Sequence, residues 1–366
     1  MNKRVLFFQG RTHRAGAQTC LARLLRHEKA RTWSPVVLSS KPGWFTEECG
    51  RLGIPVVLEE FPSSRSLSAR LFGNEAFAKR AASALQVQNF SPSIVFANDH
   101  QEGILALSLA GRLQAKTAIL LRSPGMRRED YFKYRCNEFD HISAIGDELT
   151  ERVQAWDPGK TIHAAYDGVF EDEFLEPKPK PTAAPSKLLA IGSPLDWKGW
   201  ADLTEALHIL ESRNALPNLQ IDFTGTMPLP GDNDLKLGRL KNVVCNFIGR
   251  VEKFRDLVRG YDLVMNPSRM ETFGMAAIEV LAAGVPLLSS KTGVIEDVQT
   301  NPSMLFEPEN PESLAQALRS VLDRWGNTDF GVASAQRNIR RKFMIDHAAA
   351  ALDAAFESLA GKAGAG

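Results

Sequence analysis

Short apolar runs alternate with longer segments in which apolar residues recur at helical spacing. The runs at 5–8, 36–38, 56–58, 94–96 and 118–121 predict buried strands, and 141–145 predicts a sixth. The segments 17–26, 77–88, 104–113 and 148–155 between and after them predict helices. This alternation favours a parallel sheet with helices on both faces.

The same rhythm restarts in the second half of the chain. Strands are predicted at 188–191, 219–223, 243–247, 263–265 and 286–289, and helices at 200–211, 255–261, 275–283 and 311–323. The segment 171–186 between the halves is rich in proline and has little hydrophobic periodicity, which indicates a semi-extended linker. The predicted fold class is therefore α/β, with two Rossmann-like doubly wound domains facing across a cleft.

These patterns give domain boundaries. Residues 1–170 form the expected first domain, 171–186 the linker and 187–345 the second domain. A last helical pattern at about 346–360 is expected to pack back on the first domain.

Charge is unevenly distributed along the 366 residues. The net charge is +1 overall, but it is +6 over residues 1–170 and −5 over the rest. A basic first half suits an anionic partner such as a phosphorylated acceptor or a membrane surface, and an ordinary solvated face is the alternative. No feature of the sequence indicates a nucleic-acid partner.

Two further features concern the compartment. The four cysteines, Cys20, Cys49, Cys136 and Cys245, lack metal-ligand or redox spacing, so they are interpreted as thiols of a reducing compartment. The apolar run after the basic start is too short for a signal peptide, and no apolar stretch approaches the roughly 20 residues of a spanning helix. We therefore expect a cytoplasmic protein, or one peripheral on the inner face of the membrane.

The segment 266–286 carries the most informative chemistry. Glu279 lies in a predicted helix whose neighbouring residues are all apolar, so its carboxylate is expected to be buried and to need a partner. That partner is either a protein group or a ligand hydroxyl pair such as a ribose diol. Gly274 precedes this helix, and free N–H groups at a helix start are suited to a phosphate. Glu271 would repel a phosphate, so it is expected to face neutral hydroxyl groups.

The run from Pro267 to Asp297 resembles glycosyltransferase family 4, a family of retaining enzymes with the GT-B fold. The resemblance rests on Glu271-x7-Glu279, on Glu-Thr-Phe-Gly at 271–274, and on Ala-Gly-Val-Pro at 283–286. It implies that Glu271 holds hydroxyls of the donor sugar and that Glu279 holds the ribose. It also implies that the turn and helix start bind the diphosphate and sugar through backbone N–H groups, at Thr272, Phe273, Gly274 and Met275.

Three other segments resemble donor-binding loops of that family. Residues 190–199 resemble Gly-Arg-x4-Lys-Gly, with Lys198 on the lysine that neutralises the diphosphate and Ser193 where many members have arginine. Gly249-Arg250-Val251 resembles the loop that reads the base, and Arg250 either supplies the missing charge or is merely solvated. The loop 10–18 resembles the glycine loop under the diphosphate, with Ala15 before Gly16 and with Arg14 as a further cation.

The acceptor side is expected in the first domain. Either Asn98 or His100, after the fourth predicted strand, matches a residue of the family's acceptor side. Arg122, Arg127 and Arg128 follow the fifth strand, where they either contact an anionic acceptor or form an exposed basic loop. Asp232-Asn233-Asp234 matches the Asp-x-Asp of metal-dependent transferases, but its proline and glycine neighbours favour a surface loop.

The resemblance implies a function: transfer of a sugar from a nucleotide-diphosphate sugar to an acceptor, with retention of configuration. Lys198 and Glu271, with His100 or Asn98, are the expected catalytic residues, and no metal or other cofactor is expected. The acceptor is expected to be a cell-envelope glycan or glycolipid, as in polysaccharide biosynthesis. The alternatives are an inactive homologue that acts as a binding partner and a nucleotide-sugar epimerase.

Overall fold

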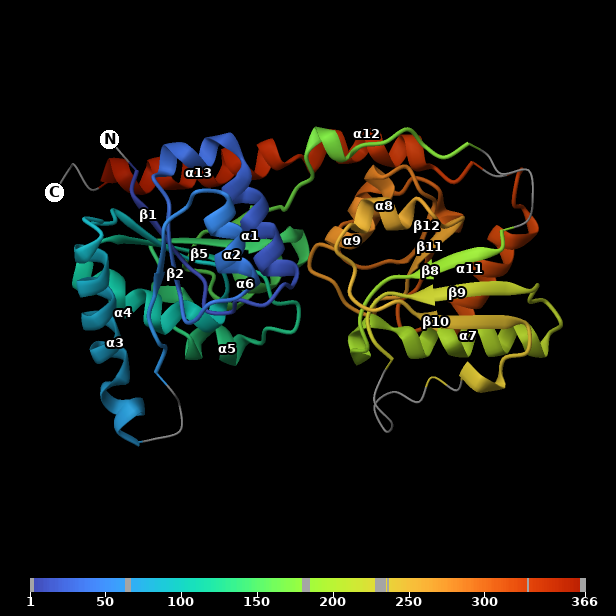
Figure 1. Cartoon of the computed structure of the whole chain (residues 1–366), viewed down its shortest axis with the longest axis horizontal. Coiled ribbons are helices and arrows are strands. Elements are labelled where there is room, and N and C mark those ends of the chain that lie inside the picture. The colour runs from blue at the N-terminus through green and yellow to red at the C-terminus, as the bar shows by residue number, and fades with distance from the viewer. Residues whose placement is uncertain are drawn as a thin grey trace. The chain divides into compact units, whose positions relative to one another are not determined.

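The computed structural model describes residues 3–62, 67–179, 185–227, 235, 237–327 and 329–362. The chain divides into two compact units (Figure 1). The first comprises Met1–Gly168 and Ile345–Gly366, and the second comprises Val169–Met344. Each unit is built around one parallel sheet, so the predicted α/β fold class is confirmed.

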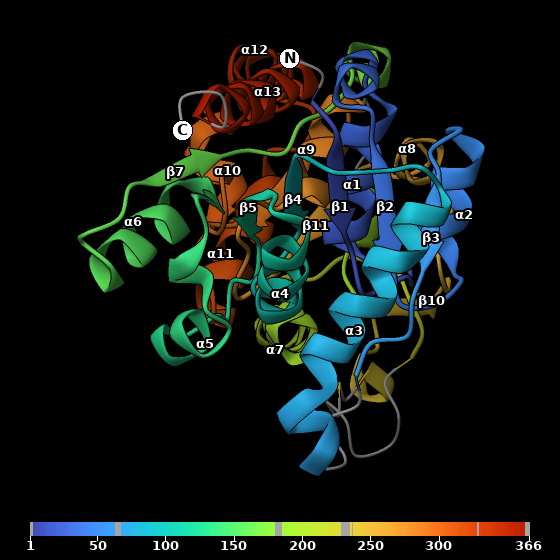
Figure 2. The same cartoon turned by 90° about the vertical axis from the view of Figure 1, so that its left-hand side faces the viewer.

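The sheet of the first unit has seven parallel strands in the order β3-β2-β1-β4-β5-β6-β7. Their bounds are β1 Val5–Phe8, β2 Val36–Ser39, β3 Val56–Leu58, β4 Ile94–Ala97, β5 Lys116–Leu121, β6 His141–Ile145 and β7 Ile162–Ala165. The helices are α1 Gly16–Arg26, α2 Trp44–Arg51, α3 Leu67–Val87, α4 Gly103–Leu113, α5 Arg128–Lys133, α6 Gly146–Trp156 and α13 Ile345–Lys362, with a 3₁₀ turn, η1, at Glu28–Trp33 (Figure 2).

Strand β1 shows why this sheet is covered on both faces. Successive side chains of a strand point to opposite faces. Phe8 packs against Phe77 of α3 with ring centroids 5.9 Å apart, whereas Phe7 packs against Phe356 of α13 at 6.1 Å. An uninterrupted apolar strand is the expected result of burial on both sides.

Helix α13 belongs to the first unit although it ends the chain. Its Asp353 accepts hydrogen bonds from Trp33 Nε1 at 2.8 Å and from Lys3 Nζ at 2.6 Å. These contacts tie it to η1 and to the segment before β1, while the ring of Phe356 fills the apolar space between them.

The sheet of the second unit has six parallel strands in the order β10-β9-β8-β11-β12-β13. Their bounds are β8 Lys187–Ala190, β9 Leu219–Phe223, β10 Val243–Phe247, β11 Leu263–Asn266, β12 Leu287–Ser290 and β13 Leu305–Phe306. The helices are α7 Trp200–Ser212, α8 Phe254–Val258, α9 Met275–Ala282, α10 Ile295–Val298, α11 Pro311–Asp323 and α12 Val332–Lys342. Helices α7 and α11 cover one face, and α9 and α12 pack together.

The first part of the segment interpreted as a linker packs on the second unit. Leu175 N–H donates to Ala282 O at 2.9 Å, and Lys178 N–H donates to Gly284 O at 2.8 Å. Gly284 has a φ of +76°, and a Cβ there would lie 2.4 Å from Glu176 O. Backbone pairing at a glycine therefore holds this part of the predicted semi-extended linker on the second unit.

Candidate functional site

The loops that follow β8 and β11 meet because these strands are neighbours in a parallel sheet. They bring together two of the residues expected to act on a donor. Lys198 Nζ donates to Glu271 Oε1 at 2.6 Å, and Ser268 Oγ donates to the same oxygen at 2.9 Å. The side chains of Lys198 and Glu271 are 24% and 18% exposed, so both are partly shielded from water and still accessible.

A tight turn places Lys198. Residues Asp196–Lys198 form a 3₁₀ turn, η5, which ends at Gly199 with a φ of +65°. A Cβ on Gly199 would lie 1.8 Å from Pro267 O, so the close approach of the two loops requires glycine. The N–H of Arg269 also donates to Trp197 O at 2.8 Å, which joins the loops a second time.

Arg269 is a residue of this site that the sequence reasoning missed. Its Nε and Nη2 each donate to Asp202 at 2.7 Å, and its Nη1 donates to both oxygens of Asp196 at 2.9 and 3.0 Å. The hydrogen bonds to Asp202 raise the pKa of Arg269 above its usual range, and the charges of both aspartates add to the effect. Arg269 thus connects the β11 loop to the turn that carries Lys198 and to the first turn of α7.

Helix α9 begins at Met275, after Gly274 in a left-handed conformation with a φ of +86°. Its first turn contains no acidic residue, which suits an anion at the start of the helix. Phe273, one residue before the cap, is buried, and its carbonyl accepts from Val294 N–H at 3.1 Å.

The expectation that α9 is buried all round is wrong. Ala277, Ile278, Val280 and Leu281 are buried, but Ala276 is exposed and Glu279 is only half-buried. Residues three apart share a face of a helix, and the small side chains on this face leave it at the surface. Glu279 is therefore held at an accessible position and not in an apolar interior.

A second pair of loops meets beside Ser193. Gly225 and Gly249 form an antiparallel bridge, with N–H to O distances of 2.6 and 3.0 Å. A Cβ on Gly225 would lie 3.6 Å from Ser193 Cα. The loop that carries Arg250 and Val251 is thus joined to the loop next to Ser193, and the Arg250 side chain is exposed.

In the first unit, Asn98 and Arg122 are structural. Asn98 Nδ2 donates to Gln9 Oε1 at 2.6 Å and to Ala17 O at 3.2 Å, and its Oδ1 accepts from Arg122 Nε at 2.9 Å. Arg122 also pairs with both oxygens of Asp167 at 2.8 and 2.9 Å, and Arg122 and Asp167 are both buried. Buried protein groups thus engage both side chains, and a contact of either one with an acceptor stays a prediction.

His100 is also buried, at 5% exposure. Its Nδ1 lies 2.9 Å from Asp99 Oδ1, and its ring packs edge-on against Tyr134. Burial alone would raise the pKa of Asp99, but the hydrogen bonds and charge of His100, with the hydroxyl of Ser123, hold it below its usual range. His100 is therefore oriented by a carboxylate.

The remaining basic residues lie nearer the surface. Arg127 and Arg128 are exposed at the start of α5, where Arg127 Nε pairs with Asp130 at 3.4 Å and Arg128 lies over the ring of Phe132. Arg14 lies over the ring of Trp44, and a Cβ on Gly16, at the start of α1, would meet no atom within 4 Å. The structure thus separates Arg127 and Arg128 from the buried Arg122.

Glu102 is the second residue that the sequence reasoning missed. Its Oε1 accepts from Gly10 N–H at 2.6 Å and Gln9 Nε2 at 3.2 Å, and its Oε2 accepts from Asn98 N–H at 3.0 Å. Burial raises its pKa to about 8, the charge of Asp99 adds to this, and the N–H groups of Gly10 and Asn98 oppose it. The sequence feature that could have indicated this residue is its position, a carboxylate directly before the apolar helix that begins at Gly103.

The described part of the chain contains neither a candidate metal cluster nor a candidate membrane span. No group of three or more His, Cys, Asp or Glu side chains there is placed to hold a metal ion. None of the described helices is long and apolar enough to cross a membrane. The Asp232-Asn233-Asp234 motif lies outside the described residues.

Part of the chain is similar in sequence to known glycosyltransferases. Residues 185–324 match the family model "Glycosyl transferases group 1". An uncharacterized glycosyltransferase of Methanocaldococcus jannaschii is 32% identical over 169 residues, 44% of this chain and 42% of that protein. Glycogen synthase of Mycobacterium tuberculosis is 29% identical over 205 residues, 54% and 46% of the two chains. The chain thus aligns with less than half the length of these two relatives.

Solved structures resemble the whole chain. HepE of Anabaena, in complex with UDP and glucose, superposes with a TM-score of 0.76 at 16% identity, over 97% of this chain and all of that one. Sucrose-phosphate synthase of Thermosynechococcus elongatus gives 0.73 at 14% identity, over 98% and 100%. Residues 185–324 are thus similar in sequence to glycosyltransferases of group 1, and the whole chain has the fold of these solved structures.

Proposed function

We propose that the protein is a retaining glycosyltransferase of family 4, which transfers a sugar from a nucleotide-diphosphate sugar to a cell-envelope glycan or glycolipid. One observation carries this proposal. The contact between Lys198 and Glu271 joins a cation to a carboxylate at the carboxyl edge of β8 and β11, inside the segment that matches the glycosyltransferase model.

Each donor group has a residue suited to it. Lys198 and the first N–H groups of α9 would hold the diphosphate, because both present positive charge to an anion. Glu271 would accept hydrogen bonds from sugar hydroxyls, and the half-buried Glu279 would do so from the ribose diol. The loop at Gly249, Arg250 and Val251 would contact the base through its backbone.

The chemical step breaks the bond between the anomeric carbon and the diphosphate oxygen. The acceptor hydroxyl oxygen bonds to that carbon on the same face, and its proton passes to an oxygen of the leaving diphosphate. Lys198 would stabilise the charge that develops on the diphosphate, which is usually the largest contribution to catalysis. We propose that this charge stabilisation requires no metal ion.

The relatives suggest which ligands to test first. The HepE structures contain UDP or UDP-glucose, and a Mycobacterium tuberculosis relative, 31% identical over 102 residues, is named a GDP-mannose-dependent phosphatidylinositol dimannoside mannosyltransferase. Another relative, in Rhizobium meliloti, is named a lipopolysaccharide core mannosyltransferase. We further propose that the acceptor belongs to the cell envelope and that the protein is cytoplasmic, or peripheral on the inner face of the membrane.

A thermal-shift screen tests the donor site. The protein is heated with UDP-, GDP-, ADP- and dTDP-sugars in the presence of EDTA. A ligand at about 100 times its dissociation constant stabilises by about 2.7 kcal/mol. We expect a clear shift with the sugars of one nucleotide, lost in Glu279→Ala and retained in Glu205→Ala, which alters an exposed glutamate of α7.

The absence of a shift with every nucleotide sugar would contradict a donor site and favour an inactive homologue. Conversion of the bound donor into an isomeric nucleotide sugar, with no acceptor present, would identify an epimerase. Product released with the configuration at the anomeric carbon inverted would overturn retention.

A further inference from the structure

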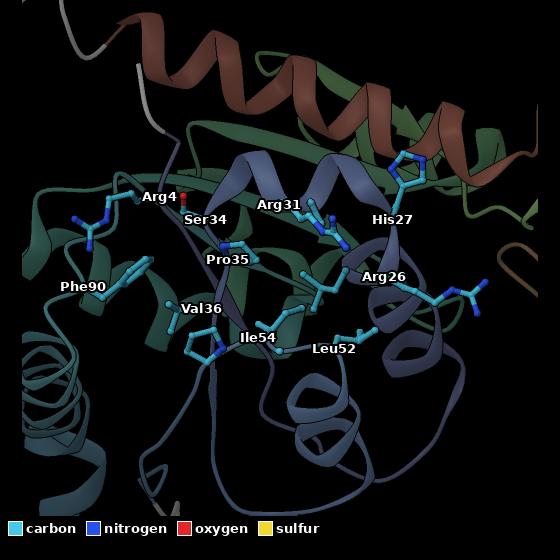
Figure 3. A pocket seen from close by; sticks show the side chains of 14 residues that line it. Arg4, Arg26, His27, Arg31, Ser34, Pro35, Val36, Leu52, Ile54 and Phe90 are labelled. Carbon is cyan, nitrogen blue, oxygen red and sulfur yellow. The ribbon is translucent and has the colours of Figure 1, made fainter.

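A pocket of about 660 Å³ lies in the first unit, away from the residues discussed so far (Figure 3). Arg4 precedes β1, Pro35 precedes β2 and Pro55 precedes β3, so the pocket opens at the amino edge of the sheet. Gln9, Asn98 and Arg122 follow their strands at the opposite edge. A ligand in this pocket would therefore occupy a site separate from the carboxyl-edge residues.

The floor of the pocket is apolar. It is formed by four side chains that are each less than 9% exposed: Leu25, Val36, Ile54 and Phe90. Because they are packed into the core, their positions are well defined. A volume of this size lies within the range of about 300–1,000 Å³ that is typical of small-molecule sites, which are mostly apolar with a few polar groups.

The charged residues around this floor have one sign. Three arginines, Arg4, Arg26 and Arg31, line the pocket, and none of the fourteen lining residues is acidic. Figure 3 shows Arg4 and Arg26 on opposite sides, with Arg31 between them extending over the cavity. Arg4 already donates to Asn89 O at 2.7 Å and lies over the ring of Phe90.

Arg31 differs from the other two. Its guanidinium forms no hydrogen bond or ion pair with any described residue, and it stands on η1, which α13 holds in place through Trp33 and Asp353. The η1 turn fixes the backbone that carries this guanidinium, and its planar fork suits phosphate oxygens.

We propose that this pocket is a second ligand site, which binds an organic phosphate with an apolar body. The phosphate would pair with Arg31, and the positive charges of Arg4 and Arg26 would add to the attraction. The apolar body would cover Leu25, Val36 and Ile54. The concave shape favours a free single-chain molecule over the flat surface of a bilayer.

Isothermal titration of the whole protein with octyl phosphate, below its micelle concentration, tests the proposal. We expect saturable binding with one molecule per chain, and at least about tenfold weaker binding in Arg31→Gln, as for the loss of one charge-assisted hydrogen bond. Arg135→Gln serves as the matched control, because Arg135 is an exposed arginine of the same unit that pairs with Glu138 instead. It is expected to bind like the wild type.

Three comparisons can overturn the proposal. Equal affinity for octyl glucoside would show that the pocket does not select an anion, and equal affinity for inorganic phosphate would show that it does not use the apolar body. Binding to phosphatidylglycerol vesicles that depends on Arg31, without binding of octyl phosphate, would assign the arginines to a membrane surface. None of these measurements needs a nucleotide sugar, so the pocket and the proposed transferase activity can fail independently.

Discussion

Lys198 Nζ lies 2.6 Å from Glu271 Oε1, and the hydroxyl of Ser268 binds the same carboxylate oxygen. In the proposed function the lysine interacts with phosphate oxygens and the glutamate with sugar hydroxyls. In the structure the two groups bind each other. This pairing keeps the long lysine side chain in place, so part of the entropy cost of ordering it is already met before a donor binds.

The first prediction concerns turnover. We expect Lys198→Ala to lower kcat by about 10²-fold or more, because one preorganised charge on the leaving diphosphate is lost. Release of the nucleoside diphosphate in a coupled assay measures this. Lys241→Ala, which removes an exposed lysine of the same unit, is the control. Turnover near the wild-type value in Lys198→Ala would exclude the lysine from the chemical step.

The second prediction concerns the support of this lysine. Arg269→Gln leaves Asp202, whose side chain is only 11% exposed, without its cation. We expect a loss of about 1.5–3 kcal/mol of stability, together with lower turnover, because the η5 turn loses its attachment to the β11 loop. Thermal unfolding and the coupled assay measure the two effects.

Asp196→Asn is the matched comparison for Arg269→Gln. The side chain of Asp196 is 69% exposed, so its pair with Arg269 is screened by water and its loss is expected to have little effect on stability. Equal losses of stability in Arg269→Gln and Asp196→Asn would show that Arg269 acts only as a surface charge. Arg269→Lys is expected to recover little, because lysine lacks the planar fork that holds Asp202 at two points.

The third prediction compares two glycines. Gly199→Ala forces a Cβ to within 1.8 Å of Pro267 O at a φ of +65°, and we expect it to cost more than about 2 kcal/mol and to displace Lys198. Gly111→Ala, in α4, meets no atom within 4 Å and is expected to stabilise by about 0.5–1 kcal/mol, since alanine favours helix. Chemical denaturation measures both, and a neutral Gly199→Ala would contradict the close approach of the two loops.

Local patterns were sufficient to predict most of the fold. The strands at 5–8, 94–97 and 263–266 are buried on both faces and, apart from Asn266, are apolar; such runs can be recognised from neighbouring residues alone. The short strands β7 and β13 were not predicted, because few residues of either are buried.

The site was less predictable because its contacts join distant residues. The loops of Lys198 and Glu271 follow strands that could be placed from the pattern, so their proximity follows from the parallel sheet. Arg122 and Asp167 are 45 positions apart, and Glu102 and Gly10 are 92 apart. No local pattern shows that such groups form hydrogen bonds with each other. For this reason the prediction for Arg122 stayed open between an acceptor contact and an exposed loop, and Glu102 was missed.

The last prediction concerns Glu102 and pH. The pKa of a carboxyl is about 4.3 in an unfolded chain, and in the folded protein that of Glu102 is raised to about 8. Between these values the folded protein binds a proton that the unfolded chain has released. The stability that this group contributes is therefore present below about pH 4 and is lost as the pH rises towards 8, with a slope of at most about 1.4 kcal/mol per pH unit.

Glu102→Gln removes this titration and leaves every other ionisable group in place. We expect the difference in the free energy of unfolding, wild type minus variant, to decrease steadily from pH 5 to pH 8 in urea denaturation experiments. Burial causes this trend, because the ionised carboxylate at the sheet edge has exchanged water for only three N–H donors, from Gly10, Gln9 and Asn98. If the free energy of unfolding of the two proteins varied with pH in parallel, the three donors would offset the cost of burial. Glu102 would then stay ionised across this range and would join the two loops as a charged acceptor.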